Sequence, residues 1–460
     1  MANKYFGNRA FYRYFLALAI PMIIQNGITN FVSLLDNIMV GQMGTVPMSG
    51  VSIVNGLLQI FNLCVFGGST GPGIFTAQFH GSRDDQGIRH TFRFKILLCG
   101  LLSILGIGIF LGFGRGLIRL YLTGDGDAAL AAGSMEYGIQ YLRLMLWGLV
   151  PFALTNAYAS TLRETGETVA PMVGGITAVL VNLVLNYVLI FGHFGAPALG
   201  VKGAALATVI SRYVELAIVA GWTHMNPGKM PFIRGAYRSM YIPKDLFKGI
   251  MVKGFPLLIN EFFWASGIAT LNQCYSTCGL DVVPAMNISS TLFNLSSVVF
   301  IALGNSVGII MGQMLGAGKQ EAEIRDTNRK LITAAVLGGV LFGLFMIIFS
   351  GLFPRLYNTT DQVRQLAAIM ICINGLYMAF YSYTNATYYT VRSGGQTAVV
   401  FLFDSCFVCC FCVPLALVLS HFTTMSIIPL YAICQGTNIV KSIIGAFMIR
   451  QGKWIRNLTA

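Results

Sequence analysis

Charged residues are scarce in this sequence. Lys, Arg, Asp and Glu make up 10% of the 460 residues, whereas hydrophobic residues make up 55%. A water-soluble domain carries roughly 25% charged residues. The composition therefore excludes a water-soluble globular protein and indicates a chain that lies mostly within a lipid bilayer.

Motifs for nucleotide and metal chemistry are also missing. The chain has no GxxxxGK[ST] phosphate-binding loop and no HExxH motif. Four of its ten cysteines lie in the apolar segment FDSCFVCCFCVP, without a histidine nearby, and a buried cysteine usually serves as a small hydrophobic residue. We expect no catalytic residue, no bound metal and no cofactor.

Long apolar segments fill most of the chain. Crossing the hydrocarbon core of a bilayer takes about 20 helical residues, and the segments are continuous rather than alternating, which favours helices over a β-barrel. The first segment is long and lacks a clear cleavage site, so we expect a helix rather than a signal peptide. We predict an all-α polytopic membrane protein with twelve transmembrane helices, at residues 13–40, 46–80, 93–115, 134–162, 168–193, 200–222, 247–276, 282–315, 329–351, 363–391, 396–420 and 425–449.

The positions of the basic residues predict the orientation of these helices. The net charge is +13, and with the N-terminus inside the cell most Lys and Arg residues fall in inner loops. Such asymmetry is the positive-inside signal. It predicts a multi-pass protein of the cell membrane with both termini in the cytoplasm, and it explains the basic charge without a nucleic-acid partner. The outer loops hold only Arg115, Arg119, Lys202, Arg355 and Arg364.

The sequence contains an internal repeat. Residues of the first half recur in the second at an offset of 235 and, further along, at an offset of 229. Each half holds six predicted helices, an even number, so the halves form parallel repeats. We predict an N-terminal lobe at 1–222, a basic cytoplasmic linker at 223–246 and a C-terminal lobe at 247–460, with alternating access between the lobes. The matched pairs include Pro21/Pro256, Gln78/Gln313, Gly81/Gly316, Asn156/Asn385, Arg163/Arg392 and Arg212/Lys441.

Several motifs together resemble one transporter family. The segments LDNIMVGQMG, QFHGSRDDQGIRH, TLRETGETVAP, VNLVLNYVLIFG, LGVKGAALATVIS and GQMLGAGKQEAEIR occur in order along the whole chain. They resemble the multidrug and toxic compound extrusion (MATE) family. The resemblance implies an antiporter, coupled to Na⁺ or H⁺, that exports small organic and often cationic molecules. The expected partners are those molecules, the coupling cation and the bilayer, and we expect a monomer.

An alternative is a lipid-linked oligosaccharide flippase of the same broad fold group. Such a protein needs a large cationic cleft for a pyrophosphate headgroup. Among the basic residues within the predicted helices, only Arg143 has no other assigned role. One basic residue does not form such a cleft, which counts against this alternative.

Acidic residues within the predicted helices are candidates for cation coupling, because an intramembrane charge is costly and needs an explanation. Asp36 lies in the first helix, in a motif that resembles the family's first-helix acid. Asn182 and Asn186 lie one turn apart on the fifth helix and have the spacing to provide ligands at the same place, or to act as packing contacts between helices. Part of the family has an acid at the position of Asn186, so a site with two carboxylates is not expected here.

Glu261 and Asp404 are the candidates in the second half. Their counterparts in the first half are Asn26 and Gly175, so the duplicated scaffold explains neither. We expect each to be stabilised by a cation, a proton or the substrate. Glu215 has Arg212 one turn away on the same helix and is interpreted as a self-neutralising pair, and Lys441 is expected to extend toward the membrane surface.

Aromatic residues on the seventh and tenth helices are candidates for a substrate cleft, since aromatic rings stack on flat cationic molecules. Rings that face lipid are more common at such positions, so only a few are assigned to the cleft. The proposed cleft residues are Gln25, Trp264, Tyr377 and Tyr381.

The topology is testable with reporter fusions. Fusions at the N-terminus, within residues 223–246 and at the C-terminus should all report a cytoplasmic location, because the basic loops allow only this orientation. A periplasmic or extracellular signal at any of the three would contradict the twelve-helix arrangement.

Overall fold

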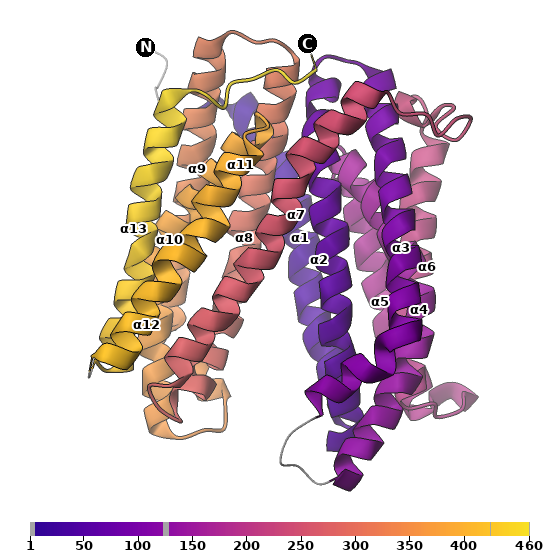
Figure 1. Cartoon of the computed structure of the whole chain (residues 1–460), viewed down its shortest axis with the longest axis vertical. Helices are drawn as coiled ribbons and strands as arrows, with labels where there is room; N and C mark the ends of the chain where they lie inside the picture. Colours follow the sequence, from indigo (N-terminus) through magenta and orange to yellow (C-terminus); the bar gives the residue numbers. More distant parts are fainter. Residues whose placement is uncertain (1–4, 123–127, 424, 460) are drawn as a thin grey trace. The chain divides into compact units, whose positions relative to one another are not determined.

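The computed structural model describes residues 5–122, 128–423 and 425–459, and every regular element in these residues is helical (Figure 1). All twelve predicted helices are present, so the prediction of an all-α polytopic protein is confirmed. Ten of them are long and apolar enough to cross a membrane. The helices are α1 Arg9–Gly41, α2 Thr45–Gly81, α3 Asp85–Tyr121, α4 Ala128–Glu164, α5 Val169–Phe191, α6 Val201–Met225, α7 Lys244–Ser276, α8 Val282–Gly316, α9 Glu321–Phe349, α10 Asp361–Ser393, the continuous segment Thr397–Phe422, and α13 Ile427–Gln451.

The segment Thr397–Phe422 is an irregular helix. It consists of α11 (Thr397–Phe401), the π-helical turns η4 (Leu402–Cys406) and η5 (Val408–Cys412), and α12 (Val413–Phe422), which has Pro414 in its first turn. Proline cannot donate a backbone hydrogen bond and distorts the preceding turn, and π-turns of this kind occur often at functional sites. Short 3₁₀ turns lie between other helices, at η1 His193–Gly195, η2 Pro231–Ile233 and η3 Phe353–Leu356.

Helix α3 begins eight residues earlier than its apolar run predicts. The carboxylate of Asp84 caps the helix by accepting hydrogen bonds from the backbone N–H groups of Gln86 and Gly87, both at 3.0 Å. As a result Arg93 and Lys95, which lie at the predicted start of this helix, lie about two turns inside it and are buried. The Lys95 ammonium forms an ion pair with Glu164 at the end of α4.

The chain divides into two compact units. The N-terminal unit comprises residues 24–76 and 84–250, and the C-terminal unit comprises residues 1–23, 77–83 and 251–460. Helices α1, α2 and α7 thus contribute residues to both. The predicted lobe limits at 222 and 247 follow the repeat alignment rather than contacts, and they stay a prediction.

In the N-terminal unit, apolar side chains from α2, α3, α4 and α6 form one core. Val54, Phe61, Cys99, Leu149 and Ala205 are among its buried members. Small residues bring helices close together where needed. A Cβ on Gly50 would lie 2.5 Å from the carbonyl oxygen of Ser134 on α4, so only glycine permits this approach between α2 and α4.

In the C-terminal unit, α10 packs against α8, α9 and α13. Its contact with α9 relies on glycine from both helices. A Cβ on Gly343 would lie 2.4 Å from the carbonyl oxygen of Gly375, and a Cβ on Gly375 would lie 2.8 Å from that of Gly343. Close packing through small residues is the usual way in which membrane helices associate, because no hydrophobic effect drives them together in lipid. The first and last described residues lie at the same end of this unit (Figure 1).

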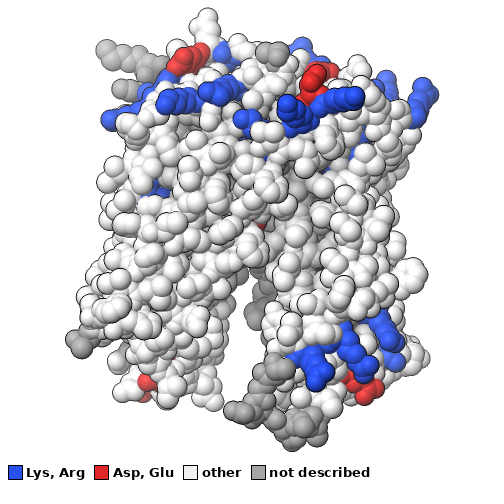
Figure 2. Space-filling view, viewed as in Figure 1, with Lys and Arg blue, Asp and Glu red and all other residues white. Residues whose placement is uncertain are grey.

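The surfaces of the units fit a bilayer. Figure 2 shows Lys and Arg residues gathered toward the ends of the helices on the face in view, with few charged residues between. Large apolar side chains are exposed along α3, among them Ile104, which is 71% exposed, and Phe113, which is 70% exposed. Water would disfavour so much exposed apolar surface, whereas hydrocarbon does not. The protein is therefore membrane-spanning.

The repeated Gln–Gly pairs meet at the ends of α2 and α8, within the C-terminal unit. A Cβ on Gly81 would lie 1.9 Å from the carbonyl oxygen of Gln313, and a Cβ on Gly316 would lie 1.8 Å from that of Gln78. The two halves thus use equivalent glycines to cross backbone against backbone. The Gln313 side chain accepts a hydrogen bond from the hydroxyl of Tyr14 at 2.7 Å.

The side chain of Gln78 also holds the end of the chain. Its amide nitrogen donates to the backbone oxygens of Ser393, at 2.9 Å, and Arg456, at 3.2 Å. Its amide oxygen accepts from the backbone N–H of Leu458 at 2.7 Å. One buried glutamine therefore ties the end of α2 to the end of α10 and to the last described segment.

Gly316→Ala should destabilise the protein by about 1–3 kcal/mol, because the added methyl group overlaps the Gln78 backbone and the crossing must open. Gly221→Ala on α6 is the matched control. Nothing lies within 4 Å of a Cβ there, so alanine should be neutral or stabilising by about 0.5–1 kcal/mol. Thermal unfolding of the two purified variants compares them, and a wild-type unfolding midpoint for Gly316→Ala would show that the crossing tolerates a side chain.

Candidate functional site

A polar cluster lies between α1, α5 and α6 in the N-terminal unit. The amide nitrogen of Asn186 donates to the carboxylate of Asp36 at 2.7 Å and to the amide oxygen of Asn182 at 3.2 Å. The Asn182 amide in turn lies against the hydroxyl of Thr208 on α6. The structure thus brings together the three residues predicted in this half. Their role in cation binding stays a prediction.

The orientation of the Asn182 amide affects how Asp36 is held. When this amide is turned by 180°, its nitrogen lies 3.0 and 2.9 Å from the two carboxylate oxygens of Asp36, and its oxygen accepts from Thr208. We favour this orientation because both amide atoms gain suitable partners in Asp36 and Thr208, and it replaces the hydrogen bond from Asn186 to Asn182 given above. The carboxylate then accepts from two amides on α5.

The amide oxygen of Asn186 has a different environment. It is buried and accepts no hydrogen bond from any group in the described residues. A buried acceptor without a donor is rare in native proteins and requires an explanation, of which a bound ion is one. Carboxylate, amide and hydroxyl oxygens are suitable ligands for a hard cation. The cluster offers all three kinds, from Asp36, the asparagines and Thr208.

Arg212 on α6 lies within electrostatic range of Asp36. Its guanidinium pairs with Glu215 at 3.1 Å, so the predicted pair on this helix is confirmed. The same group lies over the ring of Phe152, 5.0 Å from the centroid, in a cation–π contact. The N-terminal unit therefore has a fixed positive charge near its candidate carboxylate.

Asp404 in the C-terminal unit lies in the π-turn η4 and has a protein partner. The ammonium of Lys441 on α13 donates to one carboxylate oxygen at 2.7 Å, and the amide of Asn260 on α7 donates to the other at 3.1 Å. This corrects the expectation that Lys441 extends toward the membrane surface. Asp404 has a basic partner that sequence reasoning did not assign to it.

Glu261 follows Asn260 on α7 and is half-buried. Asp404 and Arg392 lie within electrostatic range, but in the described part of the chain no group forms a hydrogen bond or ion pair with its carboxylate. Glu261 and Asp404 are therefore neighbours with different environments. Their predicted coupling roles stay predictions.

The four proposed cleft residues do not share one environment. The hydroxyl of Tyr381 on α10 donates a hydrogen bond to the amide oxygen of Gln435 at 2.5 Å. Tyr377, one turn earlier, packs at the edge of the apolar core. Trp264 on α7 is 43% exposed. Gln25, in the N-terminal unit, places its amide nitrogen 2.5 Å from where a Cβ on Gly175 would lie. Their assignment to a cleft stays a prediction.

Sequence reasoning missed Thr208, Asn260 and the pairing role of Lys441. A signal for Asn260 was present, since it precedes Glu261 and aligns with Gln25 at the offset of 235. Thr208 gave no such signal, because a threonine that faces a polar cluster resembles any other helical threonine.

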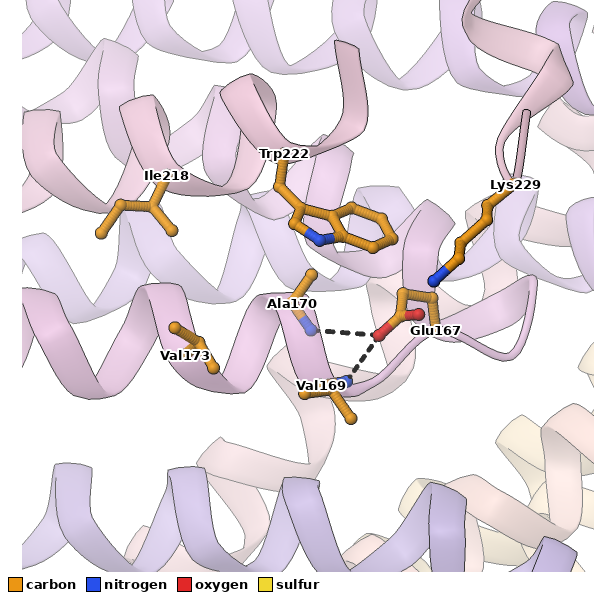
Figure 3. Close-up of a pocket in the computed structure, with 7 residues that line it drawn as sticks. All are labelled: Glu167, Val169, Ala170, Val173, Ile218, Trp222 and Lys229. Atoms are coloured by element: carbon orange, nitrogen blue, oxygen red, sulfur yellow. Dashed lines mark hydrogen bonds between the residues drawn. The ribbon is translucent and has the colours of Figure 1, made fainter. Parts of the chain in front are cut away.

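A surface pocket lies at the ends of α5 and α6 (Figure 3). Glu167 accepts from the backbone N–H groups of Val169, at 3.0 Å, and Ala170, at 3.1 Å, and Figure 3 shows the Lys229 side chain directed toward it. These hydrogen bonds satisfy the start of α5 in the manner of a helix cap. The pocket contains none of the predicted coupling residues, and its remaining lining residues are Val173, Ile218 and Trp222.

One protein family and several known proteins match this chain over most of its length. The MatE family model matches residues 21–188 and 256–420. The probable multidrug resistance protein NorM of Thermotoga maritima is 22% identical over 95% of this chain and 92% of its own length. The multidrug resistance protein MdtK of Cronobacter sakazakii is 26% identical over 79% of this chain and 78% of its own.

Solved structures show the same fold. An outward-facing multidrug resistance MATE family transporter of the MOP superfamily superposes with a TM-score of 0.83 at 19% identity, covering 95% of this chain and 94% of its own. A variant of the Vibrio cholerae MATE transporter VcmN also gives 0.83, at 17% identity, covering 97% of this chain and 98% of its own.

Proposed function

This chain belongs to the MatE family, and we propose that it exports small, cationic organic molecules across the cell membrane in exchange for Na⁺ or H⁺. The relatives named as multidrug resistance proteins support the export of such molecules. The proposed orientation has both termini in the cytoplasm, in agreement with the distribution of basic loops. The protein needs no catalytic group for this function, because the cation gradient supplies the free energy and differences in binding affinity couple it to export.

The observation that carries the proposal is the cluster around Asp36. A carboxylate on α1 lies against two amides of α5, beside a buried amide oxygen for which the described residues offer no donor. A Na⁺ ion placed there would complete the coordination of that oxygen and neutralise the carboxylate. A proton on Asp36 would also remove the charge and would give the cluster a new hydrogen-bond donor.

Neutralisation of Asp36 would change the contacts between α1 and α5. The hydrogen bond from Asn186 to the charged carboxylate is stronger than one to a neutral acid. A cation or proton therefore favours one arrangement of these helices over another, and an antiporter needs this difference in affinity between its inward-open and outward-open states. Pro21 lies within α1, near the residue at which this helix passes from one compact unit to the other. A proline at this position lowers the free energy needed to bend the helix there.

The Asp36→Asn variant should reach the membrane and fold but lose gradient-driven efflux, because the amide keeps the shape of the side chain and cannot exchange a charge. Efflux of a fluorescent cationic dye from proteoliposomes, under Na⁺ and H⁺ gradients imposed separately, measures the effect. Asp326→Asn is the control, since this acid pairs with Lys330 at a partly exposed position on α9. Efflux at the wild-type rate in Asp36→Asn would exclude Asp36 as the coupling residue.

Glu261→Gln should alter the dependence of efflux on the imposed cation gradient, because the half-buried carboxylate forms no ion pair within the described residues and is open to exchange. The same vesicle assay applies. Glu323→Gln serves as its control, since Glu323 forms an exposed pair with Lys319 that contributes at most about 1 kcal/mol. Identical gradient dependence in Glu261→Gln and the wild type would leave the cluster around Asp36 as the coupling site.

A further inference from the structure

The sixth helix of each half carries a basic residue at the same place. Arg212 on α6 and Lys441 on α13 are separated by the offset of 229 that also relates Asn156 to Asn385. Both make the same two kinds of contact. Arg212 lies over the Phe152 ring and pairs with Glu215, as described above. Lys441 lies over the ring of Phe403, 5.2 Å from the centroid, and pairs with Asp404 at 2.7 Å. The duplicated scaffold thus places a fixed cation at equivalent points of both halves.

The acid that faces this cation differs between the halves. Asp404 is equivalent to Gly175 at the offset of 229, and Asn260 is equivalent to Gln25 at the offset of 235. The equivalent residues touch in both halves. The Asn260 amide contacts the Asp404 carboxylate, and the Gln25 amide fills the space beside Gly175. The C-terminal half therefore has an acid where the N-terminal half has none, and Arg212 pairs with an acid on its own helix instead.

The pair of Lys441 and Asp404 is largely removed from solvent. The side chain of Lys441 is 12% exposed and that of Asp404 is 18% exposed. Both carboxylate oxygens of Asp404 accept a hydrogen bond, so the geometry of the pair is well satisfied. Removing one partner of a buried ion pair typically leaves a strongly unfavourable isolated charge. The charged and titratable groups around Asp404 and the adjacent Glu261 are Tyr388, Tyr389 and Arg392 on α10, and Lys441 on α13.

We propose that Lys441 is the resident counter-cation of Asp404 and that it restricts cation exchange in the C-terminal half to Glu261. An ammonium attached to the chain is present at a high effective concentration, so a dissolved cation or proton does not displace it readily. Asp404 then holds α7 and α13 together through Asn260 and Lys441, while the adjacent Glu261 stays open to an exchangeable charge. This inference rests on the proposed antiport, and it assigns the two neighbouring acids to different roles.

The test measures thermal unfolding of the purified full-length protein, which does not require transport. Each variant is unfolded in NaCl, in N-methylglucamine chloride of equal ionic strength, and over a range of pH. Lys441→Gln exposes the Asp404 charge, so Na⁺ or acidification should raise its unfolding midpoint by more than it raises that of the wild type. Lys441→Arg keeps the charge and should respond as the wild type does. Lys330→Gln, which breaks a lysine–aspartate pair on α9, should gain no response.

The double variant Lys441→Gln/Asp404→Asn identifies the carboxylate concerned. It should lose the added response to Na⁺ and pH, since the charge that caused it is absent. The proposal is overturned if Lys441→Gln gains no response, or if the double variant retains one.

A second comparison does not depend on the folding of Lys441→Gln. In the presence of Lys441, Asp404→Asn should keep the wild-type shift with Na⁺, whereas Glu261→Gln should reduce it. The pH response is not compared here, because an unpaired Lys441 alters it. Loss of the wild-type Na⁺ shift in Asp404→Asn would show that Asp404 itself exchanges the cation. Because these shifts report binding alone, a protein without antiport activity would still give a clear result here, so failure of this inference is distinguishable from failure of the proposed function.

Discussion

A charged side chain inside a bilayer must be neutralised, and this requirement governs where polar residues occur in the structure. Each intramembrane charge costs at least about 2.5 kcal/mol on insertion scales. Lys95 meets the requirement through Glu164, Arg212 through Glu215, and Lys441 through Asp404. The first pair joins α3 to α4 and the third joins η4 to α13, whereas the pair of Arg212 and Glu215 lies within α6. The ion pairs therefore act as contacts between specific helices in an environment where apolar side chains provide no such specificity.

Asp36 and Glu261 are the acids that do not follow this rule. Within the described residues neither forms an ion pair, although amides hold Asp36 and basic residues lie within electrostatic range of both. A carboxylate in this position is stabilised when a cation or proton binds and becomes unfavourable when it leaves. This is the property that an exchange site requires. Under the proposed function, the pairing of the other charges separates the carboxylates with a structural role from those that are available for exchange.

The sequence was sufficient to predict the helices because hydropathy and length report directly on a bilayer environment. It was less informative at helix ends, where α3 extends to Asp85 through a cap that hydropathy does not register. The juxtaposition of Asn182 and Asn186 followed from their spacing of one turn. The contact of Asp404 with Lys441 did not follow from spacing, because the two residues lie on different helices, 37 positions apart in the sequence. It also depends on the π-turns that set the direction of the Asp404 side chain. Tertiary pairings of this kind are fixed by helix rotation, which periodicity alone does not define.

The duplication explains how the two halves came to offer different chemistry on one scaffold. The crossing of Gly81 with Gly316 and the fixed cations at 212 and 441 are shared, so they belong to the architecture of the repeat. The acids are not shared, since Asp404 stands where the first half has Gly175 and Glu261 where it has Asn26. With a cation already built in at position 441, one acid added beside it forms a neutral pair, and only a further acid provides an exchangeable charge. In the proposed assignment Glu261 is that further acid, which gives the C-terminal half two carboxylates but one exchangeable charge.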